Sequence, residues 1–268
     1  MNKKNRPIGV FDSGIGGLTV LKEIIKEIPD EDTIYLGDTA RVPYGIRSPE
    51  TVTRYSLENT LFLSSKNIKL LVVACNTASS ISLDSIKKIT APVVGVIEPG
   101  AKAAVRATRN KRIGVIGTEA TVKSSSYAKS INEIDNNIEV CHLACPLFVP
   151  IVEEGLIEGE IAIMIAEKYL NNIKAKGIDT LVLGCTHYPL LKGIISRVMG
   201  EDVTLIDSSV EVAKEIKEIL KASDSKREQQ GNPQREFYVT DSPERFVKVG
   251  ERFLEKKIEH IEKISVVP

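Results

Sequence analysis

Two cysteines, Cys75 and Cys185, stand where a thiol could do chemistry. Each follows a short apolar run that predicts a buried strand, and residues 71–75 align without a gap with residues 181–185. Matched thiols at two strand ends suit a reaction that needs one acid or base on each side of a substrate. Racemisation is such a reaction, because it removes a Cα proton from one face and returns a proton to the other.

Polar residues follow the predicted strands and could hold a substrate beside the thiols. Hydroxyl and amide groups could bind carboxylates, Asp12 could bind an ammonium group or help to deprotonate a cysteine, and His187 could activate Cys185. In open parallel sheets, ligands bind beyond the carboxyl ends of strands. The residues at these predicted ends are Asp12, Ser13, Asn76, Thr77, Thr118, Thr186 and His187.

The protonation state of the thiols should depend on the elements that come directly after them in the chain. Both cysteines are predicted to precede helices, at residues 77–88 and 190–198, whose N-termini would favour the thiolate form. The Gly- and Pro-punctuated loop at 37–45 could cover a small ligand with its backbone groups.

Several of these features also have plainer interpretations. A single cysteine after a strand is often an inert buried residue. Asp12 could be a helix N-cap, and the loop at 37–45 could simply connect two elements. Glu153 could line a cleft, although the Glu153–Glu154 pair is typical of a solvated helix face.

Signals for a metal or a nucleotide are weak. GIGG at 14–17 is not GxGxxG, because Thr19 stands where the last glycine belongs, and GxxxxGK[ST] does not occur. Cys141, His142 and Cys145 form an isolated C-H-x-x-C without a second ligand pair, which favours core packing over a metal site. We therefore expect no cofactor and no metal.

Short β-branched runs alternate with longer amphipathic stretches, a pattern typical of βαβ units and mainly parallel sheet. We expect residues 223–236, which are polar, to form an exposed loop. The predicted helices include 18–28, 48–66, 160–176 and 210–221. The predicted strands are 8–11, 33–36, 70–74, 93–97, 113–116, 138–143, 180–183, 203–206 and 237–239.

The chain also repeats itself. IGVFDS at 8–13 resembles IGVIGT at 113–118, GVIEP at 95–99 resembles TLIDS at 204–208, and the matched cysteine strands lie between them. This order predicts an α/β protein with two similar domains, each with a mainly parallel sheet, and an active site in the cleft between them. We expect the first α/β domain to comprise residues 1–98 plus 208–268, and the second to comprise 99–207.

Bulk properties favour a cytoplasmic protein with a small-molecule partner. Lys and Arg total 36 and Asp and Glu total 36, so a formal charge of zero predicts neither nucleic acid nor an anionic membrane as partner. No apolar run approaches the roughly 18 residues of a bilayer span, and the N-terminus makes a poor signal peptide. Four cysteines are too few for a disulfide framework, so free thiols are expected.

Five segments of the chain together form a specific pattern. In chain order they are GVFDSGIGGLTV (9–20), YLGDTARVPYG (35–45), VVACNTAS (72–79), GVIEPG (95–100) and LGCTHYPLL (183–191). This set resembles the glutamate racemases, cofactor-independent enzymes of peptidoglycan precursor synthesis. The resemblance implies interconversion of L- and D-glutamate without a cofactor, for cell wall biogenesis, by a cytoplasmic homodimer.

The resemblance also implies residue roles. Cys75 would be the base for D-glutamate and Cys185 the base for L-glutamate, with Asp12 and His187 completing the catalytic group. The implied substrate contacts are Asp12, Ser13, Tyr44, Gly45, Asn76, Thr77, Thr118, Thr121, Thr186 and His187.

Other functions remain open at this point. Aspartate and hydantoin racemases are similar to this family, and a thiol pair alone would not separate their substrates, although TARVPYG and CTHYPLL favour glutamate. A two-lobed small-molecule binding protein with structural cysteines is one alternative, but it does not explain the paired thiols. A cysteine hydrolase that uses Cys185 and His187 is another, but it leaves Cys75 idle.

Overall fold

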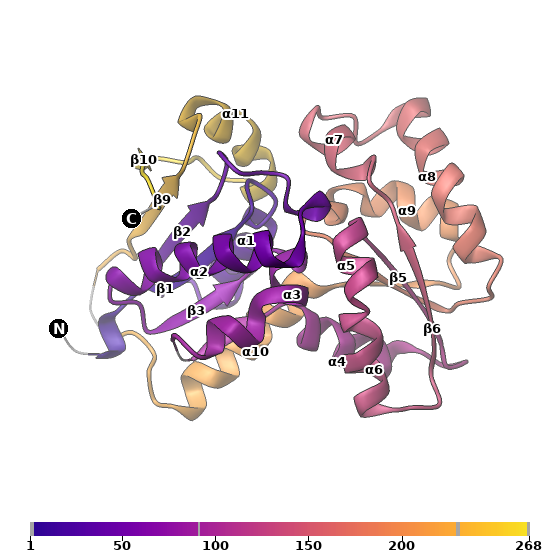
Figure 1. The fold of residues 1–268 in the computed structure, drawn as a ribbon, viewed down its shortest axis with the longest axis horizontal. Coiled ribbons are helices and arrows are strands. Elements are labelled where there is room, and N and C mark those ends of the chain that lie inside the picture. The colour runs from indigo at the N-terminus through magenta and orange to yellow at the C-terminus, as the bar shows by residue number, and fades with distance from the viewer. Residues whose placement is uncertain (1–2, 91, 229–230, 267–268) are drawn as a thin grey trace.

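The structure of the chain is a computed structural model that describes residues 3–90, 92–228 and 231–266. It shows two α/β halves side by side (Figure 1). The first half is built on a sheet that, within the described residues, has six strands in the order β10-β9-β2-β1-β3-β4, all neighbours parallel. Its strands are β1 (Ile8–Asp12), β2 (Thr33–Gly37), β3 (Leu70–Val73), β4 (Val93–Gly95), β9 (Arg235–Val239) and β10 (Ile261–Lys263).

The second half repeats the topology of the first. Its described residues form a parallel sheet in the order β6-β5-β7-β8, which is the order β2-β1-β3-β4 with each strand replaced by its counterpart four places later. The predicted fold of two similar α/β halves with parallel sheets is confirmed. The strands of this sheet are β5 (Arg112–Gly117), β6 (Glu139–Ala144), β7 (Thr180–Gly184) and β8 (Thr204–Asp207).

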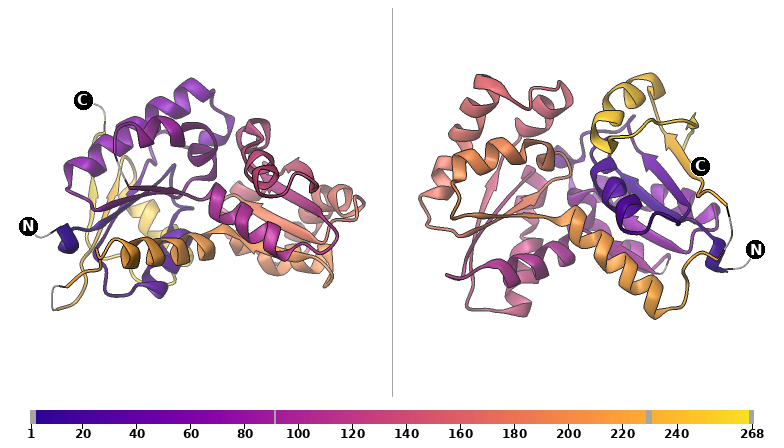
Figure 2. Two further views of the ribbon diagram at one scale, coloured as in Figure 1. Left: turned by 90° about the horizontal axis from the view of Figure 1, so that it is seen from below. Right: turned by 180° about the vertical axis from the view of Figure 1, so that it is seen from behind.

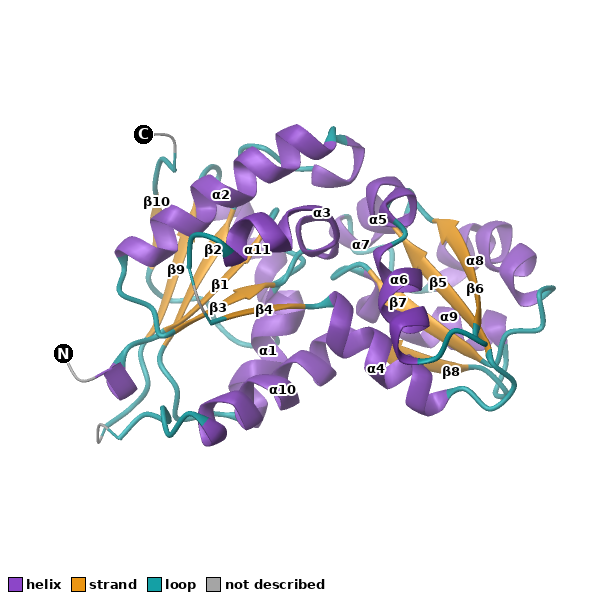
Figure 3. Ribbon diagram, turned by 60° about the horizontal axis from the view of Figure 1, so that its bottom comes forward, coloured by secondary structure: helices purple, strands orange, loops and turns teal. Residues whose placement is uncertain are grey.

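Helices cover the sheets, as the views in Figures 2 and 3 show. No helix in the described part of the chain is long and apolar enough to cross a membrane. With the first half lie α1 (Leu18–Glu27), α2 (Pro49–Ser65), α3 (Asn76–Lys87), α10 (Ser208–Ala222) and α11 (Pro243–Leu254). With the second lie α4 (Ile97–Ala107), α5 (Glu119–Ser124), α6 (Ser126–Ile134), α7 (Phe148–Glu153), α8 (Gly159–Lys174) and α9 (Lys192–Met199). Three short 3-10 helices span Lys3–Asn5, Tyr44–Ile46 and Tyr188–Leu191.

The strands are apolar on both faces because each face of the sheet is covered. Val10 and Val72 belong to one buried cluster, together with residues of α1 and α10. Their neighbours Phe11 and Val73 point the other way and belong to a second cluster, with residues of α2 and α3. Successive side chains of a strand therefore pack into the apolar clusters on the two faces of the sheet in turn, as expected for a parallel sheet with helices on both faces.

The chain passes between the halves at α4 and at α10, which pack against each other (Figure 3). We propose that the domain boundaries lie at these crossings, so that residues 1–98 with 208–268 form one domain and 99–207 the other. Apolar packing is nevertheless continuous across the boundary, because one buried cluster contains both Val10 of β1 and Val115 of β5.

Two strand predictions need correction. The strand expected at 93–97 is shorter, because β4 ends at Gly95 and α4 begins at Ile97. Strand β10 was not predicted, since it is a three-residue edge strand in which Ile261 alone is apolar. An edge strand that is mostly exposed needs no apolar run.

The segment expected to be an exposed loop, 223–236, is partly anchored. Residues 229 and 230 of this segment lie outside the described residues. β9 already begins at Arg235, and the Arg227 side chain is only 5% exposed, with its Nε 3.1 Å from Asp32 Oδ2. The polar composition of the segment did not reveal this ion pair. A buried guanidinium needs a carboxylate partner, and the sequence alone does not show that Asp32 lies next to Arg227.

Alanine substitutions at two glycines should affect stability differently. A Cβ on Gly184 would lie 2.6 Å from the Ile116 carbonyl oxygen, so we expect Gly184→Ala to lower the free energy of unfolding by about 1–3 kcal/mol. The matched control is Gly193 of α9, where a Cβ meets nothing within 4 Å. Gly193→Ala should be neutral or stabilise by up to about 1 kcal/mol. Urea unfolding measures both, and equal effects would contradict the packing at Gly184.

Candidate active site

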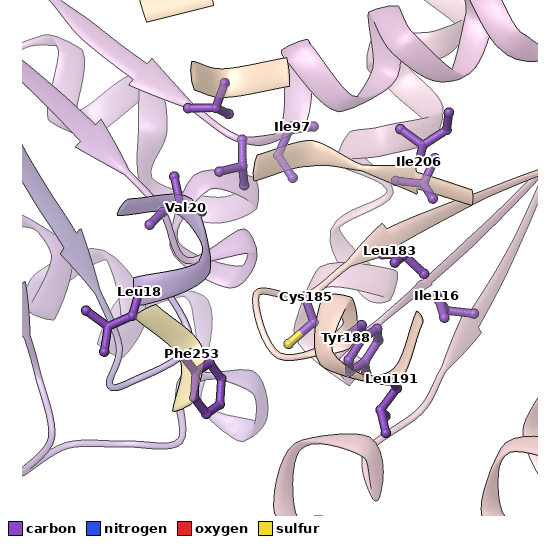
Figure 4. Close-up of a cluster of buried hydrophobic side chains, with 14 of the residues drawn as sticks. Leu18, Val20, Ile97, Ile116, Leu183, Cys185, Tyr188, Leu191, Ile206 and Phe253 are labelled. Carbon is purple, nitrogen blue, oxygen red and sulfur yellow. The ribbon is translucent and has the colours of Figure 1, made fainter. Parts of the chain in front are cut away.

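Cys75 and Cys185 follow β3 and β7, which are equivalent strands of the two sheets. Both side chains are buried, at 5% and 6% exposure. Figure 4 shows the Cys185 sulfur where the two halves meet, with Leu183 of β7 on one side of it and Phe253 of α11 on the other. The repeat of the fold thus places one thiol at the same end of each sheet.

Cys75 is a protonated thiol at neutral pH. Its Sγ accepts the Ala78 N–H at the start of α3 and donates to Ser13 Oγ, both at 3.5 Å. Burial, followed by the negative charges of Asp12 and Cys185, raises the pKa of the Cys75 thiol to about 12. The Ala78 N–H at the helix N-terminus does favour the thiolate, as expected, but burial raises the pKa by more than this hydrogen bond lowers it.

Cys185 begins a buried chain of three interacting groups. Its Sγ lies 3.8 Å from His187 Nδ1, and His187 Nε2 lies 3.2 Å from Glu153 Oε1. Burial by itself lowers the pKa of His187, but the hydrogen bonds and charges of Cys185 and Glu153 prevail and raise it to about 10. The hydrogen bond to His187 in turn lowers the pKa of Glu153. At neutral pH His187 is an imidazolium that can stabilise a thiolate on Cys185.

The helix predicted directly after Cys185 begins later than expected. A 3-10 helix spans Tyr188–Leu191, and α9 starts only at Lys192. The N-terminus of an α-helix therefore does not follow Cys185 directly, and the charged group that contacts its Sγ is the imidazolium of His187.

Asp12 ends β1 and is fully buried. Its Oδ2 accepts the Gly14 N–H at 2.9 Å, whereas its Oδ1 has no hydrogen-bond partner among the residues that the structure describes. Burial raises the pKa of Asp12, and the positive charge of His187 opposes this shift. The N-cap interpretation is wrong, because Gly17 precedes α1. An unpaired buried carboxylate oxygen is suited to a cation such as an ammonium group.

Three threonine hydroxyls meet between the halves. Thr77 Oγ1 lies 2.9 Å from Thr118 Oγ1 and 3.3 Å from Thr121 Oγ1, and Thr118 and Thr121 are 3.0 Å apart. Gly45 closes over this cluster, because a Cβ there would lie only 2.7 Å from Thr118 Cβ. Hydroxyls can rotate to donate, so the cluster can present several donors to a carboxylate.

Asn76, the first residue of α3, is 3% exposed. Its Oδ1 accepts the Tyr127 hydroxyl at 2.7 Å, while its Nδ2 has no partner within the described part of the chain. A buried amide donor without a partner complements an anionic acceptor, as Asp12 Oδ1 complements a cation.

Tyr44 lies in the short 3-10 helix Tyr44–Ile46 and is buried. Its hydroxyl donates to Asp38 and accepts from Asn59 Nδ2, the latter at 3.1 Å. The side chain is therefore engaged within the first half, so the proposed substrate contact at this place falls to the backbone of Tyr44 and Gly45.

Thr186 joins the two halves through its backbone. Its carbonyl oxygen accepts the Thr19 hydroxyl at 3.0 Å. A Cβ on Gly16 would lie 2.2 Å from Thr186 Oγ1, so the glycine-rich turn after β1 lies directly against the Cys185 segment. The glycines of the GIGG turn thus allow close contact between the halves.

Cys141 and His142 lie in β6, and Cys145 directly follows it. Burial raises the pKa of the Cys145 thiol and lowers that of the His142 imidazole. Among the described residues, no group of three or more His, Cys, Asp or Glu side chains is arranged to hold a metal ion.

The family of Asp/Glu/hydantoin racemases matches residues 8–216 of this chain. This chain belongs to that family. A glutamate racemase from Geobacter metallireducens is 55% identical over 264 residues, which cover 97% of each chain. The structure is similar to glutamate racemase from Francisella tularensis in complex with D-glutamate (41% identity, TM-score 0.93) and to an isoform from Bacillus anthracis (41%, 0.94). Each structural match covers 98% of both chains.

Sequence reasoning left parts of this racemase-family site unassigned. Glu153 contacts His187, whereas Glu154 points outward with a side chain 71% exposed, a difference that an adjacent pair of glutamates does not reveal. Arg245 of α11 lies 3.6 Å from Glu153 Oε2 but is distant in sequence. Tyr127 stands in an amphipathic helix, where an aromatic residue usually signals only core packing.

We expect the His187 imidazole to titrate near pH 10 and to titrate at lower pH in Glu153→Gln, because the amide no longer stabilises the imidazolium. NMR can follow this ring, since the chain has only three histidines. Glu154→Gln is the matched control and should leave the titration unchanged. Titration of His187 below pH 7 in the unmodified protein would contradict the assignment.

The same raised pKa links stability to pH. Folding raises the pKa of His187 above its ordinary value of about 6.5, so its stabilising contribution is complete below that pH and is lost as pH rises through about 10. The stability difference between the unmodified protein and Glu153→Gln should therefore shrink between pH 7 and pH 10 in urea unfolding. A constant difference would show that the imidazolium does not depend on Glu153.

Proposed function

We propose that this protein interconverts L-glutamate and D-glutamate by proton transfer at Cα, without a cofactor. The observation that carries the proposal is the pair of buried thiols at equivalent strand ends, one neutral and one beside an imidazolium. The glutamate racemases among its relatives support the choice of substrate.

The two thiols would act from opposite faces of the substrate. With L-glutamate bound, the Cys185 thiolate takes the Cα proton while His187 stabilises the starting charge. The Cys75 thiol then donates its proton to the other face of the planar carbanion, which yields D-glutamate. One sulfur has gained a proton and the other has lost one, so the reverse reaction begins from this state.

The unpaired polar atoms would bind the charged groups of the amino acid. Asp12 Oδ1 would accept from the α-ammonium group, and Asn76 Nδ2 would donate to a carboxylate. The hydroxyls of Ser13, Thr77, Thr118, Thr121 and Thr186, with the backbone at Tyr44 and Gly45, supply further hydrogen-bonding groups. Asp12 Oδ1 and Asn76 Nδ2 would then each gain the hydrogen-bond partner that they lack in the free protein.

The surroundings of the two thiols suit the roles proposed for them. Burial raises the pKa of Cys75, so this thiol holds a proton that it can donate, and the imidazolium of His187 lies beside Cys185. After each turnover the proton must pass from Cys185 back to Cys75, and solvent, His187 and Asp12 are the groups available to carry it.

A cysteine hydrolase is the second candidate, because Cys185, His187 and Glu153 form a thiol–imidazole–carboxylate chain. These three side chains resemble the nucleophile, the base and the orienting carboxylate of a hydrolase. It gives no role to Cys75, which is equally buried and stands at the equivalent strand end, so we favour the racemase.

The wider role is inferred from the relatives. We infer that the D-glutamate supplies peptidoglycan biosynthesis, and with it cell wall biogenesis and cell shape, and that the protein acts in the cytoplasm as a homodimer.

Incubation with L-glutamate in D2O tests the function directly. Loss of the Cα proton by NMR together with appearance of D-glutamate by circular dichroism, with no added cofactor, is the expected result. Parallel incubation with aspartate separates the two amino acid racemases. No exchange from either glutamate enantiomer, in folded and reduced protein, would refute the proposal and favour hydrolysis or binding.

We expect Cys75→Ala and Cys185→Ala each to lower racemisation by about 10²–10⁴-fold, because each removes one of the two acid–base groups. Thermal unfolding should show that both variants still fold. Cys141→Ala is the matched control, since this half-buried thiol of β6 lies outside the site, and its turnover should stay within about twofold. Normal racemisation by either active-site variant would exclude the two-thiol mechanism.

A further inference from the structure

Tyr127 of α6 connects the two halves at the site. It belongs to the second half and is 1% exposed, yet its hydroxyl donates to Asn76 Oδ1 of the first half at 2.7 Å. Asn76 directly follows Cys75. A tyrosine outside every motif of the chain thus touches the residue next to one of the thiols.

The ring of Tyr127 is held on two sides. A Cβ on Gly184 would lie 3.2 Å from Tyr127 Cε2, and a Cβ on Gly100 would lie 3.2 Å from Cε1. Gly184 directly precedes Cys185, so the ring packs against the strand end that carries the second thiol. The absence of side chains at the two glycines lets this large ring fit, and leaves it little freedom to move.

The Tyr127 ring also lies beside the start of α10. A Cβ on Gly100 would lie 3.1 Å from Ser208 Cβ as well as 3.2 Å from Tyr127 Cε1. Burial raises the pKa of Tyr127 more than the nearby Ser208 side chain lowers it. Tyr127 therefore keeps its hydroxyl proton, which it donates to Asn76 Oδ1.

The hydrogen bond from the Tyr127 hydroxyl determines the orientation of the Asn76 amide. With Oδ1 engaged by Tyr127, the NH2 group must point elsewhere, and it finds no acceptor among the described residues. We propose that Tyr127 is a positioning residue that fixes the Asn76 NH2 group toward a carboxylate of the substrate. The inference deepens the proposed glutamate racemisation and rests on it for the identity of the ligand.

The test is Tyr127→Phe, which keeps the ring and removes the hydroxyl. KM for both enantiomers should rise about three- to tenfold, the size expected for one neutral hydrogen bond. The value of kcat should change less than about twofold, because a carboxylate contact is made equally in the ground state and the transition state. A purely structural tyrosine would lower the melting temperature and leave KM unchanged.

Two further variants make the result specific. In the Asn76→Ala background, Tyr127→Phe should raise KM no further, because its effect passes through the missing amide. Tyr169→Phe is the matched control, since its hydroxyl accepts the Leu147 N–H at 3.4 Å away from the thiols, and it should leave KM and kcat unchanged. If the effects of Asn76→Ala and Tyr127→Phe on KM were additive, the proposal would be overturned.

The NMR signals of the Asn76 side-chain amide test the positioning role without a measurement of turnover. In ¹⁵N NMR spectra we expect a single pair of NH2 signals that shifts or broadens in Tyr127→Phe. If the unmodified protein does not racemise glutamate, the proposed function fails, whatever these signals show. If it does racemise glutamate but neither KM nor the signals respond to Tyr127→Phe, the positioning role alone is refuted.

Discussion

The structure depends on giving two buried thiols at equivalent strand ends different surroundings. In the proposed mechanism one thiol donates a proton while the other accepts one, so two thiolates or two neutral thiols would not serve. Burial, followed by the negative charge of Asp12, raises the pKa of Cys75 and keeps it protonated. Cys185 lies beside the imidazolium of His187, which in turn contacts Glu153.

This asymmetry is built on a symmetrical frame. β3 and β7 hold the same position in two sheets of the same strand order, so their carboxyl ends present the thiols in equivalent ways. The differences come from the residues after the strands. In the first half α3 begins at once after Cys75, while in the second half a 3-10 helix delays α9 and leaves room for His187.

The sequence was most informative where local pattern and chemistry coincide. Strand positions, the repeat and both cysteines can be read from apolar runs and the polar residues after them, so the two α/β halves were predictable. The end of β4, the edge strand β10 and the 3-10 helix after Cys185 were not. Contacts between distant segments were not predictable either. Glu153 could not be distinguished from Glu154, and Tyr127 was not singled out, because their partners are distant in sequence. The burial that makes Cys75 a thiol arises from tertiary packing, which overrides the local helix N-terminus.

The same burial explains how such a site can bind a small, highly charged amino acid. Asp12 Oδ1 and Asn76 Nδ2 are removed from water without a partner among the described residues, which destabilises the free protein. An ammonium group and a carboxylate would satisfy both at once, so part of the binding free energy comes from relieving this cost. A ligand that lacks one of the two charges leaves one atom unpaired and gains much less. In the proposed function, selectivity for amino acids would therefore come from the polar atoms that the fold leaves without partners, and the thiols would act on the molecule that those atoms bind.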